Sequence, residues 1–136
     1  MESEPDIRYL VSPNVSNDEL NALFRAAREA HADRDFGAVL GRSLGYVCGF
    51  QGERLVGFVN VAWDGGLHAF LLDATVHPDV RRQGIGRPLV AAAVDLARAA
   101  GVEWVHADLE PELRDFYAAC GFRPTEASLI HLVDDG

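Results

Sequence analysis

The stretch VRRQGIGRPL, residues 80–89, places three arginines and two glycines in ten positions and contains no acidic residue. It stands out in this chain, whose 136 residues carry a formal net charge of −9. An apolar segment with the composition of a strand ends before it, near Val76. After it, Leu89, Ala93 and Leu96 recur at helical spacing. The stretch is therefore predicted to form the turn from a strand into a helix.

A turn of this kind can bind an anion. The first backbone N–H groups of a helix have no partner within the helix, and the helix dipole adds positive potential at the same end. Gly84 and Gly86 let the backbone approach a phosphate without an intervening Cβ. Arg81, Arg82 and Arg87 add formal positive charge. We therefore predict that the stretch serves a phosphate-bearing ligand.

Two common nucleotide-binding motifs do not fit. The dinucleotide fingerprint needs a third glycine, but Gly86 is followed by Arg87, Pro88 and Leu89. The strand before the turn also closes a run of antiparallel strands instead of opening a βαβ unit. A GxxxxGK[ST] loop is excluded because the chain has no lysine and all its cationic side chains are arginine. A nucleotide-binding module is therefore disfavoured.

The periodicity of the remaining sequence predicts the order of strands and helices. Strands are expected over residues 7–11, as an antiparallel meander over 44–76, over 103–109, and as one or two closing strands within 122–136. Helices are expected from the Ser16–Glu19 capping box to about His31, over 87–100 and over 111–120, with a short helix or an irregular loop over 31–43. The strand over 103–109 follows a helix and should pair in parallel with its predecessor.

These elements predict one domain over residues 1–136 with an α/β fold of the α+β type. Its mixed, mostly antiparallel sheet should have six to seven strands and about four flanking helices. The acidic balance argues against a nucleic-acid partner, and the apolar runs are too short to cross a membrane. The N-terminus has no signal-peptide pattern, Cys48 and Cys120 make no disulfide framework, and the five histidines have no metal-ligand spacing. We expect a cytoplasmic protein without a metal.

Two motifs carry a family resemblance. The stretch VHPDVRRQGIGRPL, residues 76–89, resembles the acyl-CoA-binding signature of the GNAT superfamily of N-acyltransferases, whose core is [RQ]-x-x-G-x-[GA]. FYAACGF, residues 116–122, resembles the second landmark of that family, a tyrosine on a helix that closes with Gly-Phe. The resemblance covers nearly the whole chain in topology and residues 67–123 in motif detail. It implies a GNAT-like acyltransferase fold with acetyl-CoA as co-substrate.

The resemblance also implies where acetyl-CoA would bind. The backbone amides of about Gln83 to Arg87 would hold the pyrophosphate, and the pantetheine arm would pair with backbone between the strands at 69–76 and 103–109. The implied contacts are Ala74, Val76, Arg81, Arg82, Gln83, Gly84, Ile85, Gly86 and Arg87. Two positions depart from the family: Pro88 has no N–H to donate, and Glu110-Pro111 stands where members often have an asparagine.

The reaction needs a proton donor for the departing thiolate. Tyr117 would lie near the sulfur, and a phenol with a pKa near ~10 can protonate a thiolate whose conjugate acid resembles cysteine at about 8.5. The alternative is a core tyrosine on the apolar face of its helix. Cys120 could suggest a covalent acyl-enzyme, but a buried cysteine more often packs as a small hydrophobe.

The reaction also needs a base for the ammonium proton. Asp73 ranks first because an acid is unusual inside an apolar strand, although a structural carboxylate is an equal alternative. His68 and Asp108 are the other candidates. Alternation places His68 on one face and Asp73 with Leu71 on the other, but a bulge, common in this strand of the family, would change that parity.

The sequence therefore predicts an N-acetyltransferase that moves the acetyl group directly to a primary amine of a small, cationic acceptor. Acidic residues in segments that border the acceptor groove in the family, Asp33, Asp35 and Glu126, would favour such an acceptor. Aminoglycosides, polyamines, arylalkylamines, amino acids and protein N-termini all fit. The alternative function is a non-catalytic acyl-CoA-binding sensor or regulatory module. Exposed closing strands would also allow a homodimer.

Overall fold

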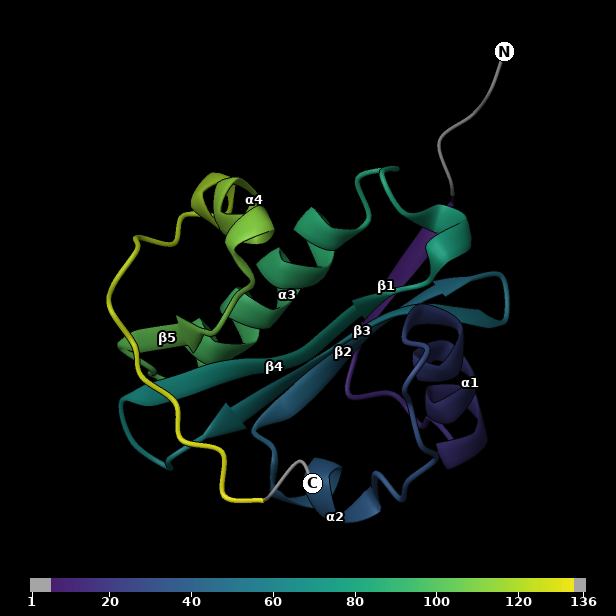
Figure 1. Ribbon diagram of the computed structural model, residues 1–136, viewed down its shortest axis with the longest axis horizontal. Helices are drawn as coiled ribbons and strands as arrows, with labels where there is room; N and C mark the ends of the chain where they lie inside the picture. The colour runs from purple at the N-terminus through teal and green to yellow at the C-terminus, as the bar shows by residue number, and fades with distance from the viewer. Residues whose placement is uncertain (1–5, 134–136) are drawn as a thin grey trace.

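The computed structural model describes residues 6–133 and contains one five-stranded sheet (Figure 1). Its strands, in spatial as well as chain order, are β1 (Ile7–Val11), β2 (Gly45–Gln51), β3 (Arg54–Trp63), β4 (His68–Val76) and β5 (Trp104–Ala107). Neighbours are antiparallel except β4 and β5, which are parallel. The predicted first strand, the meander and the parallel fifth strand are confirmed.

Helices cover both faces of the sheet. They are α1 (Asn17–Ala27), α2 (Gly37–Arg42), α3 (Gly86–Ala99) and α4 (Arg114–Ala119), with 3₁₀ turns η1 (Pro78–Val80) and η2 (Pro111–Leu113). The capping box is confirmed: Ser16 and Glu19 exchange side-chain and backbone hydrogen bonds at the start of α1. No helix within residues 6–133 is long and apolar enough to cross a membrane.

The first helix is shorter than predicted. It ends at Ala27, and Arg28 already has extended backbone angles. The reason lies in Asn21, whose buried side-chain amide accepts a hydrogen bond from Arg34 N–H and donates one to Arg34 O. Because this amide binds the backbone of a later segment, residues 28–36 fold back on α1 as an irregular loop instead of extending it.

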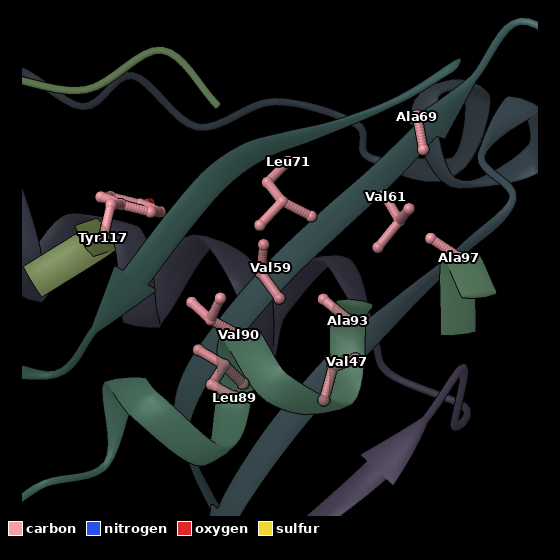
Figure 2. Close-up of a cluster of buried hydrophobic side chains, with 10 residues drawn as sticks. All are labelled: Val47, Val59, Val61, Ala69, Leu71, Leu89, Val90, Ala93, Ala97 and Tyr117. Carbon is pink, nitrogen blue, oxygen red and sulfur yellow. The ribbon is translucent and has the colours of Figure 1, made fainter. Parts of the chain in front are cut away.

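Each face of the sheet has its own core. The core on the α3 face joins side chains of β2, β3 and β4 to α3 and α4 (Figure 2), namely Val47, Val59, Val61, Ala69, Leu71, Leu89, Val90, Ala93, Ala97 and Tyr117. The core on the α1 face is richer in aromatic rings and consists of Leu20, Leu23, Phe24, Phe36, Cys48, Phe50, Leu55 and Phe58. Both α1 and α3 contact β4, from opposite faces of the sheet, so this strand separates two distinct environments.

The predicted closing strands are wrong for residues 122–133, which form no strand. Figure 1 shows this tail running from α4 past β5 toward α2. Leu129, Ile130, Leu132 and Val133 are 70–86 % exposed. These apolar residues do not alternate with polar ones, so the tail cannot bury one face as a strand does, and β5 offers only four residues for pairing. The rest of the predicted segment, 134–136, lies outside the described residues.

Candidate functional site

A gap opens between the parallel strands β4 and β5. Their pairing ends at Leu71 and Ala107, whereas β4 continues to Val76. The N–H of His77 donates to the carbonyl oxygen of Val56 on β3 at 2.8 Å. Because backbone groups alternate along an antiparallel ladder, those of Val76 point away from β3 and into the gap, where the carbonyl accepts from Arg81 and the N–H is free for a ligand. An extended ligand could therefore pair with this free edge of β4 like an added strand.

A β-bulge interrupts β4 beside the gap. Phe58 pairs with Thr75 and Asn60 pairs with Leu72, so two residues of β4 oppose one of β3. Asp73 is at the bulge and has a φ of +58°, a rare conformation for a residue other than glycine. The bulge implied by the family resemblance is present, and the simple alternation that grouped Asp73 with Leu71 is wrong.

The turn at 80–89 leads from the gap into α3. Its helix begins at Gly86, as predicted within one residue, and the N-cap Ile85 supplies no side-chain hydrogen bond. The first N–H groups of α3 thus remain available to a ligand. Gly84 has a φ of +77°, and a Cβ placed there would meet no atom within 4 Å. Tyr9 of β1 fixes the turn by donating its hydroxyl to the Ile85 carbonyl at 3.1 Å.

The second glycine of the turn, Gly86, also has a packing reason to lack a side chain. A Cβ at Gly86 would lie 3.1 Å from Cζ of Phe116 on α4. The absence of a side chain at Gly86 therefore lets α3 and α4 approach each other. At Gly84, by contrast, a Cβ would meet no atom of the described residues, which leaves the space that the predicted role requires.

The arginines of the turn have unequal roles. Arg81 donates to the Val76 and Ala27 carbonyls at 3.2 and 3.4 Å, which ties the turn to the ends of β4 and α1. Arg87 reaches the carbonyl of Ala119 on α4 at 3.4 Å. Within residues 6–133, Arg82 has no side-chain partner, and its φ is +64°. Of the three arginines of the turn, Arg82 alone makes no side-chain hydrogen bond or ion pair with the described residues.

Tyr117 lies at one end of the α3-face core (Figure 2). Its ring makes edge-to-face contacts with Phe116 and Phe122, at centroid distances of 5.2 and 5.4 Å. Its hydroxyl has no hydrogen-bond partner among the described residues. Because no side-chain oxygen or nitrogen of these residues is both buried and unpaired, the hydroxyl oxygen must be accessible to solvent. Burial, followed by the nearby Cys120, raises the pKa of Tyr117 above its usual value. The phenol therefore stays protonated at neutral pH, as a proton donor must.

The cysteines have the properties of packing residues. Burial raises the pKa of the Cys48 thiol to about 12, with a smaller contribution from Glu19. Burial also raises the pKa of Cys120, against a smaller opposing effect of Arg87. A thiol that stays protonated is a poor nucleophile, which supports the packing role expected for Cys120.

Two of the candidate bases lie on the α1 side of the sheet. Because Ala69 and Leu71 belong to the α3-face core, the side chain of His68 points to the opposite face, as predicted. His68 Nδ1 lies 2.8 Å from Nε2 of His106, which also stacks on Phe70. Sequence reasoning missed His106, although the parallel pairing of two alternating strands could have indicated this contact.

The third candidate base stands apart. Asp108 is exposed and follows directly after β5, at the opposite side of the gap from the bulge. Within residues 6–133, no three or more His, Cys, Asp or Glu side chains form a group that could hold a metal ion.

A pocket of about 310 Å³ opens beside the bulge on the α1 face. It is lined by Phe24, Arg28, Ala30, His31, Ala32, Arg34 and Asp73. Two acidic residues expected near an acceptor groove bind elsewhere: Asp33 pairs with Arg25 at 2.6 Å, and Asp35 accepts hydrogen bonds from Asn17 and the N–H of Gly37. Sequence reasoning identified Asp73 but missed the arginines of this pocket.

Comparisons with known proteins identify the family and the fold. The model of the Acetyltransferase (GNAT) family matches residues 12–122. The mycothiol acetyltransferase of Mycobacterium avium (strain 104) is 32% identical over 130 residues, which cover 88% of this chain but only 40% of that relative. A GNAT family acetyltransferase from Streptococcus pneumoniae TIGR4 superimposes with a TM-score of 0.78 at 23% identity, covering 93% of this chain and 99% of that structure. The aminoglycoside N-acetyltransferase AAC(6')-Iy in complex with CoA gives 0.74 at 18% identity, covering 92% and 93%.

Proposed function

Because the chain belongs to the acetyltransferase (GNAT) family, we propose that it transfers the acetyl group of acetyl-CoA directly to a primary amine of a small acceptor. Acetyl-CoA is the acyl donor of this family. The observation that carries the proposal is the gap between β4 and β5, whose free strand edge leads to the uncapped start of α3. An amine is a cation in neutral solution, and the acidic balance of the chain would attract it.

The residues along the gap and the turn fit acetyl-CoA. The pantetheine arm would pair with the backbone of Ala74 and Val76, and the pyrophosphate would bind the N–H groups from Gln83 to Arg87. The open space at Gly84 supports this fit because a side chain there would occupy the approach. Arg82, which no described residue neutralises, would add charge beside the pyrophosphate.

The two faces of β4 would divide the chemistry. Bound acetyl-CoA supplies an acetyl thioester, and the acceptor approaches from the α1 face, where Asp73 lines the pocket. The amine nitrogen forms a bond to the carbonyl carbon while the C–S bond breaks. Asp73 accepts the proton that the amine loses, and the Tyr117 hydroxyl protonates the sulfur. The proton is thus accepted on the α1 face of β4 and donated on the α3 face.

Calorimetry with acetyl-CoA tests the binding half of the proposal. Gly84→Ala and Gly84→Glu share the same backbone strain at a φ of +77°, and neither Cβ meets another atom. Only the glutamate adds a negative charge and bulk at the pyrophosphate, so it should lose about 100-fold or more in affinity. The alanine variant adds only a Cβ to this approach, so it should lose much less affinity than the glutamate variant. If both variants bind equally, the turn does not hold the pyrophosphate.

Release of CoA thiol on a panel of primary amines tests the catalytic half. An acetyltransferase should release one CoA per acetylated amine. A protein that binds acetyl-CoA and releases none with any amine would instead be a sensor, which is the alternative function.

A further inference from the structure

We propose that the pocket beside Asp73 selects an acceptor that carries an anionic group, a carboxylate or a phosphate, in addition to its amine. This inference rests on the proposed function, because the pocket opens on the face from which the acceptor would approach. It concerns a property of the acceptor that the chemistry of acetyl transfer does not require.

The pocket is locally positive in an acidic protein. Arg28 and Arg34 contribute two guanidinium groups to its lining, and Asp73 contributes the one carboxylate. The chain as a whole has a net charge of −9. A positive surface of this kind is therefore a local feature, which the average composition does not explain.

Arg28 is held by neutral groups. Its Nη2 donates to Oγ1 of Thr75 at 2.9 Å, and its guanidinium lies 4.8 Å from the centroid of the Phe24 ring. No carboxylate within residues 6–133 pairs with it. These contacts fix the orientation of the guanidinium and leave its charge uncompensated, so it can bind a carboxylate or a phosphate through its remaining N–H groups.

The guanidinium of Arg34 also packs against aromatic rings. Its guanidinium lies 4.6 Å from the Phe36 ring centroid and 5.8 Å from that of Phe24. Its Nη2 lies 3.3 Å from Oδ2 of Asp73, longer than the ~2.7–2.9 Å typical of a charge-assisted hydrogen bond. Asp73 can balance only one of the two guanidinium charges in the lining, so the pocket retains an excess of positive charge.

The loop that carries Arg34 is fixed before any ligand arrives. The side-chain amide of Asn21 bonds both the N–H and the carbonyl of Arg34, at 3.0 and 2.9 Å, and its Oδ1 lies 2.9 Å from Nε2 of His31. Both Asn21 and the His31 side chain are buried. Because the loop is already ordered, little binding free energy is lost to ordering it when a ligand binds.

The charges fit an acceptor with two opposite ends. Its ammonium group would lie at Asp73, next to the gap and the thioester, while its anionic group would bind Arg28 and Arg34. An acceptor with only positive charges would meet two guanidinium groups, and like charges at close range oppose binding. The pocket therefore favours a zwitterionic amine over a polycation.

Matched pairs of amines test this inference. Phenylalanine and phenethylamine differ by a carboxylate, and phosphoethanolamine and ethanolamine differ by a phosphate. We would measure kcat/KM from CoA release and acceptor affinity by calorimetry on the CoA-saturated protein. The anionic member of at least one pair should be preferred by about tenfold or more, and the pair that shows the preference identifies the group.

Arg28→Gln and Arg34→Gln should each lower that preference by about tenfold without changing the affinity for acetyl-CoA. Arg98→Gln is the matched control. It removes the same charge from the exposed surface of α3, where Arg98 bonds Asp95 at 2.7 Å, and it should change neither quantity.

Three results would overturn the inference. The first is equal or better use of the uncharged-tail amines. The second is an Arg28→Gln variant that loses affinity for acetyl-CoA but not for acceptors, which would place Arg28 in the co-substrate site. The third is the absence of any binding of the anionic amines. If no amine is acetylated, the proposed catalysis fails, but arginine-dependent binding of an anionic amine would still support the pocket.

Discussion

The turn at 80–89 and the loop at 28–36 both contribute arginines to the candidate site, but they are built in opposite ways. The turn is local: a glycine at positive φ and an uncapped helix start follow one another along the chain. The loop has no regular structure, and a buried amide from another element, Asn21, holds it in place.

This difference separates the two halves of the site. The co-substrate half depends on backbone groups of consecutive residues, so many side chains could vary there without loss of binding. The acceptor half depends on side chains that meet only in the folded protein. We therefore expect changes in the turn to affect acetyl-CoA alone and changes in the loop to affect the acceptor alone.

The largest effect should come from Tyr117→Phe, on the co-substrate side. Removal of the hydroxyl should lower kcat by about 10²- to 10⁴-fold, the usual contribution of a general acid. The affinity for acetyl-CoA and the stability should change little, because the ring contacts with Phe116 and Phe122 remain. Steady-state kinetics of CoA release measures this effect. A variant with full activity would make Tyr117 a packing residue.

The pH profile of kcat/KM provides a second test of Tyr117. Burial raises the pKa of this phenol above 10.0, so the protonated donor is present below that value and is lost as the pH rises through it. A Tyr117-dependent decrease of kcat/KM should therefore lie above pH 10 and be missing from the phenylalanine variant. A decrease at neutral pH that depends on Tyr117 would contradict this assignment.

Asp73→Asn should have the next largest effect, on the acceptor side. It keeps the shape of the side chain but removes the base, so kcat/KM should decrease by about 10²-fold while acetyl-CoA still binds. His106→Ala is the comparison. If His106→Ala has the larger effect, the His68–His106 pair accepts the proton, and Asp73 serves mainly to position Arg34.

The same division explains what the sequence could predict. The turn, the start of α3 and the tyrosine on α4 follow from local patterns, and all are where the sequence placed them. The pocket was not predictable, because Arg28 was expected inside the first helix, which in fact ends at Ala27, and Arg34 lies in a segment without periodicity. The position of Arg34 depends on Asn21, which in the sequence is only a polar residue of a helix.

Two other features needed the assembled sheet. The bulge at Asp73 arises from the pairing of β3 with β4, and a single strand does not reveal its register. The tail at 122–133 has enough apolar residues for a strand, but strand formation also requires a partner edge and an alternating pattern. Its failure to pair reduces the predicted sheet to five strands.

Asn21→Ala should affect the acceptor half alone. The loss of the amide leaves the backbone of Arg34 without its partners, which should lower the free energy of unfolding by about 1–3 kcal/mol. The loop should loosen, so KM for the acceptor should rise several-fold while the affinity for acetyl-CoA is unchanged. Urea unfolding, steady-state kinetics and calorimetry measure the three quantities. A parallel loss of acetyl-CoA affinity would show that the two halves are not independent.

The smallest effect concerns the two glycines of the turn. Gly86→Ala places a methyl group 3.1 Å from Phe116, so it should lower the free energy of unfolding by about 1 kcal/mol, as overpacking does. Phe116→Leu should restore this loss, because the leucine leaves room for the methyl group. Gly84→Ala should lose about 1 kcal/mol through its left-handed backbone alone, and Phe116→Leu should not restore it. The opposite result would be a Gly86→Ala variant that loses the same stability with Phe116 and with Leu at position 116, and that binds acetyl-CoA more weakly. Gly86 would then serve the phosphate, and both glycines of the turn would act through the local backbone.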